Sequence, residues 1–462
     1  MGNASNRTLR AAAFLSFLFH LTAHADVATE IDEGLAKSRR QSPERARRAS
    51  AIIDRSRDIE GVRTMWDATL TRVVSRGSRI GNQPNRDPLM NQGNHVGQID
   101  QLTGLRAFLA LWVVTRHLFY PFENGAFIDF GIRFAAFDHG YLGVDGFFIL
   151  SGFILAYNYA NGKPLDYRAF VGARIARIYP IHFVTLLGAI GLVFLKQFVF
   201  HKHVIGTGQN TYPALAANVV LLNAWSFKFV TGWNDVAWSV SAEWFAYVFF
   251  PLFVALAPTR NRLFAAVLLL VPAGALAVIE WRSSAALSLP GGLARLIPEF
   301  YAGVLLFRLR SSSGFASLPR ALGLAAIGVI ALGIAVQLDT LTVAGLGLLI
   351  FALSSNADLV APLLAFRPIV YLGEISYCLY MVQRFPMEGL SLARKASTAL
   401  AGSPLMQLIV LLATLLVVSH WAHRLIELPG RKWLRRVLSA RQVRPRTVAT
   451  HGPQSAAGVV RE

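Results

Sequence analysis

The chain has 462 residues, of which 54% are hydrophobic and only 15% are charged. A soluble domain carries about a quarter charged residues, so this composition excludes an ordinary soluble protein. A net charge of +19 would suit nucleic acid, but the arginines gather in short segments between apolar runs and in both tails. That distribution is typical of the positive-inside rule and argues against a nucleic-acid partner. The one cysteine, Cys378, excludes an internal disulfide.

The first 98 residues are polar and rich in arginine, apart from one apolar stretch. That stretch, "RAAAFLSFLFHLTAHAD", resembles a signal peptide. Cleavage after it would put residues 26–98 outside the cell, next to a helix end that the charge pattern assigns to the cytoplasm. We therefore favour a disordered N-terminal extension over residues 1–98, followed by a membrane domain over 99–437 and a basic cytoplasmic tail over 438–462.

The apolar runs predict an all-α fold, a polytopic membrane bundle of about ten transmembrane helices in the lipid bilayer. Each run approaches the roughly 20 apolar residues that are needed to cross a bilayer as a helix. The candidate spans are 104–122, 140–159, 174–196, 238–257, 262–281, 290–308, 320–337, 341–354, 369–388 and 405–425.

Basic residues in the short loops orient these spans. Arg174 with Arg177, Arg260 with Arg262, and the run after the tenth span all fall on one side if there are ten spans. Both termini are then cytoplasmic, as in a multi-pass protein of the inner membrane. An eleventh span at 213–226 would turn later basic loops outward, so we expect an outer-face or re-entrant helix there.

The first predicted span carries two ionisable residues on one stripe. Arg106 lies near its inner end, and His117 lies eleven residues further along, which is about 16 Å and within ~20° of the same face. A snorkelling arginine and a histidine satisfied by a neighbouring helix are the structural alternative. Ionisable residues inside a membrane usually mark a functional site, and more of them follow in later spans.

The third and fourth spans add further ionisable residues. Arg174 and Arg177 lie one helical turn apart, where two guanidinium groups match phosphate oxygens, although they also serve as topology signals. Glu243 lies about five residues below the outer start of the fourth span, which predicts a depth similar to that of His117. A histidine–carboxylate pair is a common general base, so we expect these two residues to pair. In the second span we expect Asp145 to be structural.

Four segments together resemble the acyltransferase 3 family of integral membrane O-acyltransferases, over about residues 98–437. They are "IDQLTGLRAFLALWVVTRH" with Arg106 and His117, "YLGVDGFFILSGFIL" with Asp145 and Ser151, "RIARIYP" with Arg174 and Arg177, and "WSVSAEWFAYVFFP" with Trp238, Ser239, Glu243 and Tyr247. The segments "YLGEISYCLYMVQRFP" and "IELPGRKWL" complete the resemblance. One departure is that the ninth span has Gln383 and Arg384 where relatives often have histidine.

The resemblance implies transfer of an acyl group, commonly acetyl, from cytoplasmic acyl-CoA to a hydroxyl of a glycan or lipid-linked sugar acceptor. Acyl-CoA, expected to be acetyl-CoA, is then a co-substrate, and neither a cofactor nor a metal is expected. We assign acyl-CoA binding to Arg106, Arg174 and Arg177. Base catalysis is assigned to His117, and the orientation of that base to Glu243. Asp145, Ser151, Trp238, Ser239 and Tyr247 are expected to support the site.

Two other functions fit the same composition. A transporter or flippase for a lipid-linked saccharide would also need many spans with buried Arg, His and Glu. It would not need an arginine cluster together with a histidine–carboxylate pair. A sensor without catalysis is the second alternative, and the departure at Gln383 keeps it open.

Overall fold

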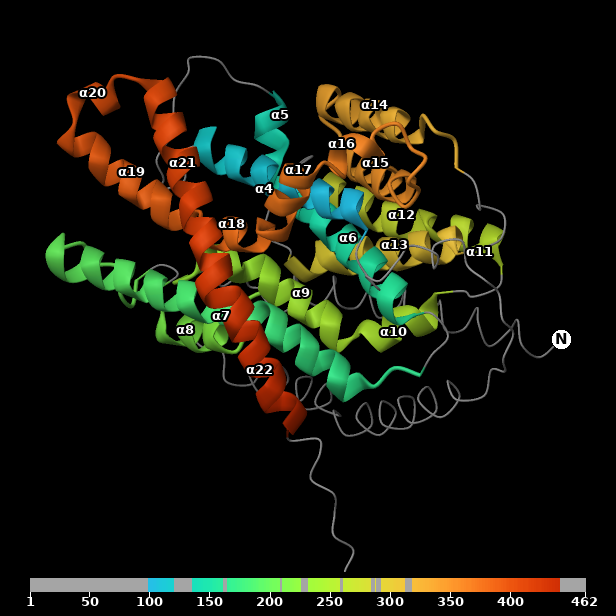
Figure 1. Ribbon diagram of the computed structural model, residues 1–462, viewed down its shortest axis with the longest axis horizontal. Coiled ribbons are helices and arrows are strands. Elements are labelled where there is room, and N and C mark those ends of the chain that lie inside the picture. Colours follow the sequence, from blue (N-terminus) through green and yellow to red (C-terminus); the bar gives the residue numbers. More distant parts are fainter. Residues whose placement is uncertain are drawn as a thin grey trace, which may run out of the picture.

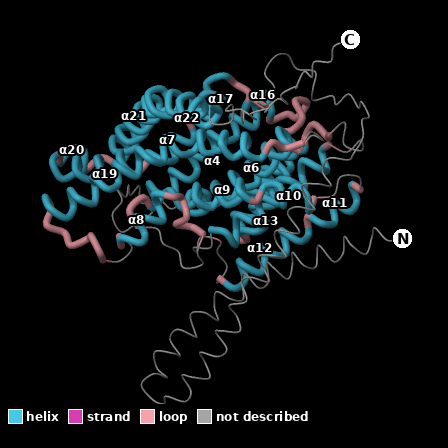
Figure 2. Tube along the Cα trace, turned by 90° about the horizontal axis from the view of Figure 1, so that it is seen from below, coloured by secondary structure: helices cyan, strands magenta, loops and turns pink. Residues whose placement is uncertain are grey.

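The computed structural model describes residues 99–119, 135–160, 164–207, 210–225, 232–257, 261–283, 287, 292–311 and 318–440. Within these ranges every regular element is a helix (Figures 1 and 2). The all-α fold is therefore confirmed for the described part. The predicted N-terminal extension and most of the C-terminal tail lie outside the described residues.

Most of these helices follow one another closely along the chain. The α-helices are α4 (Asp100–Phe119), α5 (Ala135–Asp138), α6 (Leu142–Tyr159), α7 (Tyr167–Phe194), α8 (Tyr212–Val219), α9 (Trp238–Val248), α10 (Phe250–Leu256), α11 (Arg262–Leu268), α12 (Leu270–Arg282), α13 (Gly292–Arg310), α14 (Leu322–Ala335), α15 (Asp339–Ala352), α16 (Ala361–Leu364), α17 (Arg367–Glu374), α18 (Ser376–Val382), α19 (Arg384–Ala396), α20 (Thr398–Ala401), α21 (Pro404–Ala422) and α22 (Leu428–Ala440). The 3₁₀-helices are η2 (His139–Tyr141) and η4 (Asp235–Ala237), and the π-helices are η3 (Leu195–Val199) and η6 (His423–Glu427).

Local sequence signals set where several helices begin and bend. The side chain of Asp166 caps α7 by accepting a hydrogen bond from the backbone N–H of Ala169 at 3.0 Å. Ser403 caps α21, whose first residue is Pro404, because proline lacks the N–H that the first turn leaves unpaired anyway. Between α9 and α10 the chain bends by 60°, and Pro251 lies in the first turn after that bend.

By length and apolar composition, four of the described helical segments can cross a membrane: Ala135–Tyr159, Tyr167–Val199, Leu263–Arg282 and Pro404–Leu438. The bent pair α9–α10 makes a fifth if it counts as one span. The chain is therefore a multi-pass membrane protein. The other predicted spans do not meet these criteria. Helices α4 and α13 carry several charged residues, and α14 and α15 have only 14 residues each. The ninth predicted span is divided among the short helices α17, α18 and α19. Helix α8 has eight residues, about 12 Å in length, too short to cross.

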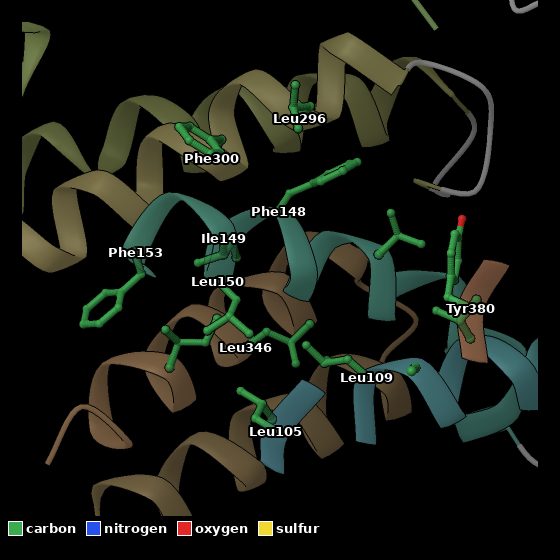
Figure 3. Close-up of a cluster of buried hydrophobic side chains, with 14 of the residues drawn as sticks. Leu105, Leu109, Phe148, Ile149, Leu150, Phe153, Leu296, Phe300, Leu346 and Tyr380 are labelled. Atoms are coloured by element: carbon green, nitrogen blue, oxygen red, sulfur yellow. The ribbon is translucent and has the colours of Figure 1, made fainter. Parts of the chain in front are cut away.

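The most extensive helix contact joins α6 and α13 at the centre of the bundle. A Cβ atom at Gly152 would collide with the backbone carbonyl of Phe300, and one at Gly303 would collide with the carbonyl of Ile149. Glycine permits this close backbone approach. Figure 3 shows Ile149, Phe153 and Phe300 among the buried apolar side chains around this contact.

Relative helix directions can be read from pairs of contacts. Helices α4 and α6 are antiparallel, since Gly140 packs on Trp112 and Gly143 packs on Leu109. Helices α6 and α13 are parallel, because Asp145 bonds Arg295 near one end and the carbonyl of Ala160 accepts from Arg308 at the other, at 2.9 Å. Helices α7 and α22 are antiparallel, with contacts of Gly172 to Leu438 and of Pro180 to Gly430. These directions agree with a chain that alternates in the predicted order.

Helices α19 and α20 extend away from the rest of the bundle together with the start of α21 (Figures 1 and 2). Near this extension α7 runs parallel to α18 and α19. The hydroxyl of Tyr377 donates to the carbonyl of Ile178 at 2.6 Å, and Lys196 pairs with Glu388 at 2.6 Å.

Candidate active site

A cavity lies among α4, α6, α7, α9 and α18, which are far apart in the sequence. It is lined by Arg106, Val144, Phe147, Phe148, Leu150, Ser151, Ile154, Leu155, Arg174, Arg177, Ile178, Ser239, Val240, Glu243, Tyr247, Ser376, Tyr377 and Tyr380. Seven of the residues that the sequence singled out are among them: Arg106, Ser151, Arg174, Arg177, Ser239, Glu243 and Tyr247. The fold thus gathers most of the predicted site into one place.

Three guanidinium groups give the cavity its positive charge. Arg106 Nε donates to Ser376 Oγ at 3.3 Å, and its guanidinium lies 5.8 Å from the ring centroid of Phe147. Arg174 donates to the hydroxyl of Tyr159 at 3.2 Å, near the end of α6. It also lies over the ring of Tyr247 at 5.9 Å. Aromatic faces hold a cation without neutralising it, so the charge remains available for an anionic ligand.

Glu243 lies in the same cavity and is bonded to Ser151. The Ser151 hydroxyl donates to Glu243 Oε1 at 2.5 Å. Electrostatically the carboxylate acts on both Arg106 and Arg177. Glu243 is therefore a half-buried counter-charge of the arginine cluster.

A second counter-charge, Glu427, was not singled out from the sequence. Glu427 is 4% exposed in the π-helix η6 and acts electrostatically on Arg177. Its Oε2 accepts hydrogen bonds from Cys378 Sγ at 3.0 Å and from His423 Nδ1 at 2.8 Å. The ligand atoms of these three side chains lie within 4.8 Å of one another, as a metal site would require, although the nearby Arg177 opposes a cation there. The available signal was the "IELPG" segment, in which Glu427 is the single acidic residue of a basic helical stretch.

His117 is not among the residues that line the cavity. Its neighbour Arg116 packs against Gly140, directly before α6, whereas the partner of Glu243 is Ser151, eleven residues further along. Eleven residues of helix rise about 16 Å. These contacts place Glu243 further along α6 than Arg116, the neighbour of His117, rather than at the similar depth that the sequence suggests. The pairing of His117 with Glu243 stays a prediction.

The start of α9 explains this difference. Residues 235–237 form the 3₁₀-helix η4, and Trp238 at the start of α9 packs edge-on against Phe148, with ring centroids 6.3 Å apart. Helix α9 thus begins beside the middle of α6 rather than beside its first turn. Among the described residues, the charged group with the strongest influence on His117 is the carboxylate of Asp235, which precedes α9.

Asp145 is bonded away from the cavity. It forms a bidentate pair with Arg295 of α13, with Arg295 Nε at 2.9 Å from Oδ1, and these residues are 0% and 3% exposed. Trp238 lies 5.9 Å from the same guanidinium and also does not line the cavity. Glu299, one turn along α13, is fully buried beside this pair. Arg295 and Glu299 were missed, although two charged residues four apart in an apolar run were a visible signal.

Gln383 and Arg384 stand where the resemblance to the family would place a histidine. Gln383 is 1% exposed and lies near enough to His117 to act on its imidazole. Arg384 donates to Asp235 Oδ1 and to the carbonyl of Trp233, both at 2.8 Å. Gln383 and Arg384 thus lie with His117 and Asp235 at the end of α4, beyond the cavity.

A helical membrane bundle that holds basic residues and a carboxylate in one internal cavity has the features of a membrane enzyme acting on an anionic co-substrate. A family model described as an acyltransferase domain matches residues 99–421. The chain therefore belongs to the acyltransferase 3 family. Membership in this family disfavours the flippase and sensor alternatives.

Two curated proteins are similar to parts of the chain. "Acyltransferase MdmB" of Streptomyces mycarofaciens is 32% identical over 163 residues, which are 34% of this chain and 39% of that protein. "Putative peptidoglycan O-acetyltransferase YrhL" of Bacillus subtilis (strain 168) is 28% identical over 200 residues, 40% of this chain and 28% of that protein. The chain thus matches well under half the length of either relative. No solved structure matches the chain significantly.

Proposed function

We propose that this acyltransferase moves an acyl group, most simply acetyl, from cytoplasmic acyl-CoA to a hydroxyl of a membrane-presented glycan or lipid-linked sugar. The observation that carries this proposal is the cavity that Arg106, Arg174 and Arg177 share. CoA carries a pyrophosphate and a 3′-phosphate, and guanidinium groups bind phosphate oxygens in a bidentate manner. The Bacillus relative is named for O-acetylation of peptidoglycan, which supports a sugar-containing acceptor.

We further propose that the membrane domain crosses the inner membrane ten times, with both termini in the cytoplasm. The parallel and antiparallel helix pairs support this path, because every pair described above has the direction that ten alternating spans require. Helices α4 and α13 then cross although they carry charges. Those charges face the bundle interior, as in the buried Asp145–Arg295 pair.

In this orientation the arginine end of the cavity faces the cytoplasm. Arg174 lies at the end of α6 beside Tyr159 and is placed to bind the CoA phosphates first. The pantetheine arm has amides and a hydroxyl, which can bond Ser151, Glu243 and Ser376 along the cavity wall. We therefore assign Glu243 to binding the donor.

The acceptor reacts at the other end, where His117 is the general base. An alcohol becomes a good nucleophile when a base takes its proton during attack. The acceptor oxygen forms a bond to the acyl carbon, the thioester C–S bond breaks, and the proton held by His117 passes to the CoA thiolate. We assign the supporting carboxylate to Asp235, which acts electrostatically on the imidazole and pairs with Arg384 at 2.8 Å, next to Gln383.

The experiment that tests this function compares the esters on surface glycans with and without the active protein. We expect that His117→Ala abolishes the ester detected by mass spectrometry, while the thermal unfolding temperature of the purified protein stays within a few degrees of wild type. The matched control is His203→Ala, because His203 is exposed outside the cavity. An unchanged ester content in the His117 variant would remove this residue from the chemistry.

A further inference from the structure

The cavity is elongated along α6. The residues of α6 that line it extend from Val144 to Leu155, a rise of about 16 Å. Arg174 marks one end, because it bonds Tyr159 at the close of α6. The other end lies one helical turn from Gly140, the residue against which Arg116 packs beside His117.

Tyr380 lies at this second end and is held in place. Its ring is 8% exposed, and its hydroxyl donates to the backbone carbonyl of Val236 at 3.0 Å. The same hydroxyl accepts a hydrogen bond from Ser239 Oγ at 2.8 Å. In Figure 3 Tyr380 lies at the opposite side of the apolar cluster from Phe153, which is nearer the arginine end of α6. Two hydrogen bonds and burial leave this ring little freedom to move.

Beyond Tyr380 lies the region of His117. Gln383, three residues further along the chain, acts on the imidazole of His117, and Val236 is the neighbour of Asp235. Tyr380 lines the cavity whereas His117 does not. Tyr380 therefore lies at the end of the donor cavity that is nearer to His117.

We propose that Tyr380 closes the acyl end of the donor cavity and sets the longest acyl chain that the enzyme accepts, which restricts it to short-chain acyl-CoA. This inference rests on the proposed function, in which the arginine end holds the CoA phosphates. With the thioester beside Ser239, the acyl tail meets the tyrosine ring. A tail that is too long must displace a hydrogen-bonded ring from a well-packed site, which is unfavourable. Removing the ring opens space, in which each buried methylene contributes roughly fourfold in affinity.

The test measures dissociation constants of the purified full-length protein in detergent for CoA, acetyl-CoA, butyryl-CoA and hexanoyl-CoA. For wild type we expect hexanoyl-CoA to bind at least roughly tenfold more weakly than acetyl-CoA. In Tyr380→Ala we expect that difference to disappear or to reverse. The matched control is Tyr380→Phe, which keeps the ring and removes the hydroxyl, and which we expect to keep most of the chain-length limit.

The results distinguish a failure of the Tyr380 proposal from a failure of the proposed acyl-CoA function. If neither CoA nor acetyl-CoA binds, both proposals fall. If both bind but Tyr380→Ala keeps the wild-type preference, or if wild type binds hexanoyl-CoA as well as acetyl-CoA, Tyr380 does not set the chain length and the proposed function stands. Should the alanine variant unfold, Tyr380→Leu replaces it, and the same loss of preference is expected because leucine is shorter than the tyrosine ring.

Discussion

The positive charge in the cavity is balanced by carboxylates from two different helices. Glu243 acts on Arg106 and Arg177 from α9, and Glu427 acts on Arg177 from η6. Burying an unpaired charge costs several kcal/mol, so these carboxylates allow the arginines to remain inside the bundle. Arg174 instead lies over aromatic rings, and we infer that it is the arginine most available to a phosphate.

This arrangement predicts different effects for arginines of the same helix. We expect Arg174→Ala to weaken acyl-CoA binding by roughly tenfold to a hundredfold, the range for losing a hydrogen bond to a charged group. Titration of the purified protein with acetyl-CoA measures the change. The matched control is Arg168→Ala, because Arg168 is exposed on α7 outside the cavity. Equal affinities in the two variants would argue against the phosphate site.

At the scale of elements, the contact between α6 and α13 positions the site. Helix α6 carries Ser151 and α13 carries Arg295, which bonds the buried Asp145. The contact at Gly152 and Gly303 brings the backbones of α6 and α13 close together, within reach of the Arg295–Asp145 pair. A displacement of α13 would shift α6, and with it one wall of the cavity.

We therefore expect Gly303→Ala to destabilise the protein. Its new Cβ would collide with the carbonyl of Ile149, and backbone cannot move aside as a flexible side chain can. Overpacking of this kind costs about 1–3 kcal/mol, measurable as a lower unfolding temperature in detergent. The matched control is Gly328→Ala on α14, where a Cβ meets nothing within 4 Å. There we expect no loss, and a small gain from higher helix propensity.

At the scale of the whole molecule, the alternation of helix directions makes a test of topology possible. Asn261 at the start of α11 and Thr398 at the start of α20 are both exposed, and ten spans place them on opposite sides of the membrane. A cysteine at 261 should react with an impermeant thiol reagent only from the cytoplasm, and a cysteine at 398 only from outside. Native Cys378 is fully buried and should not react. Labelling of both positions from one side would overturn the proposed ten-span topology.

Much of the site could be predicted from the sequence because the relevant residues are unusual where they stand. A charged residue in an apolar helix is costly, so Arg106, Arg177 and Glu243 were visible without coordinates. Tyr377, Tyr380 and Ser376 line the same cavity but were not singled out as site residues. Tyrosine and serine are ordinary in a helix, and only their position relative to other helices gives them a role.

The sequence by itself determined the class of the protein: helical, embedded in a membrane, basic on one side, and carrying ionisable residues within its spans. These properties follow from local composition and from spacing within single helices. The partner of each buried charge was decided only by tertiary structure. Helix α9 begins beside the middle of α6, so Glu243 accepts a hydrogen bond from Ser151 and Asp235 lies near His117. No pattern within one helix reports how far it is shifted along its neighbour, because packing between distant segments sets that shift.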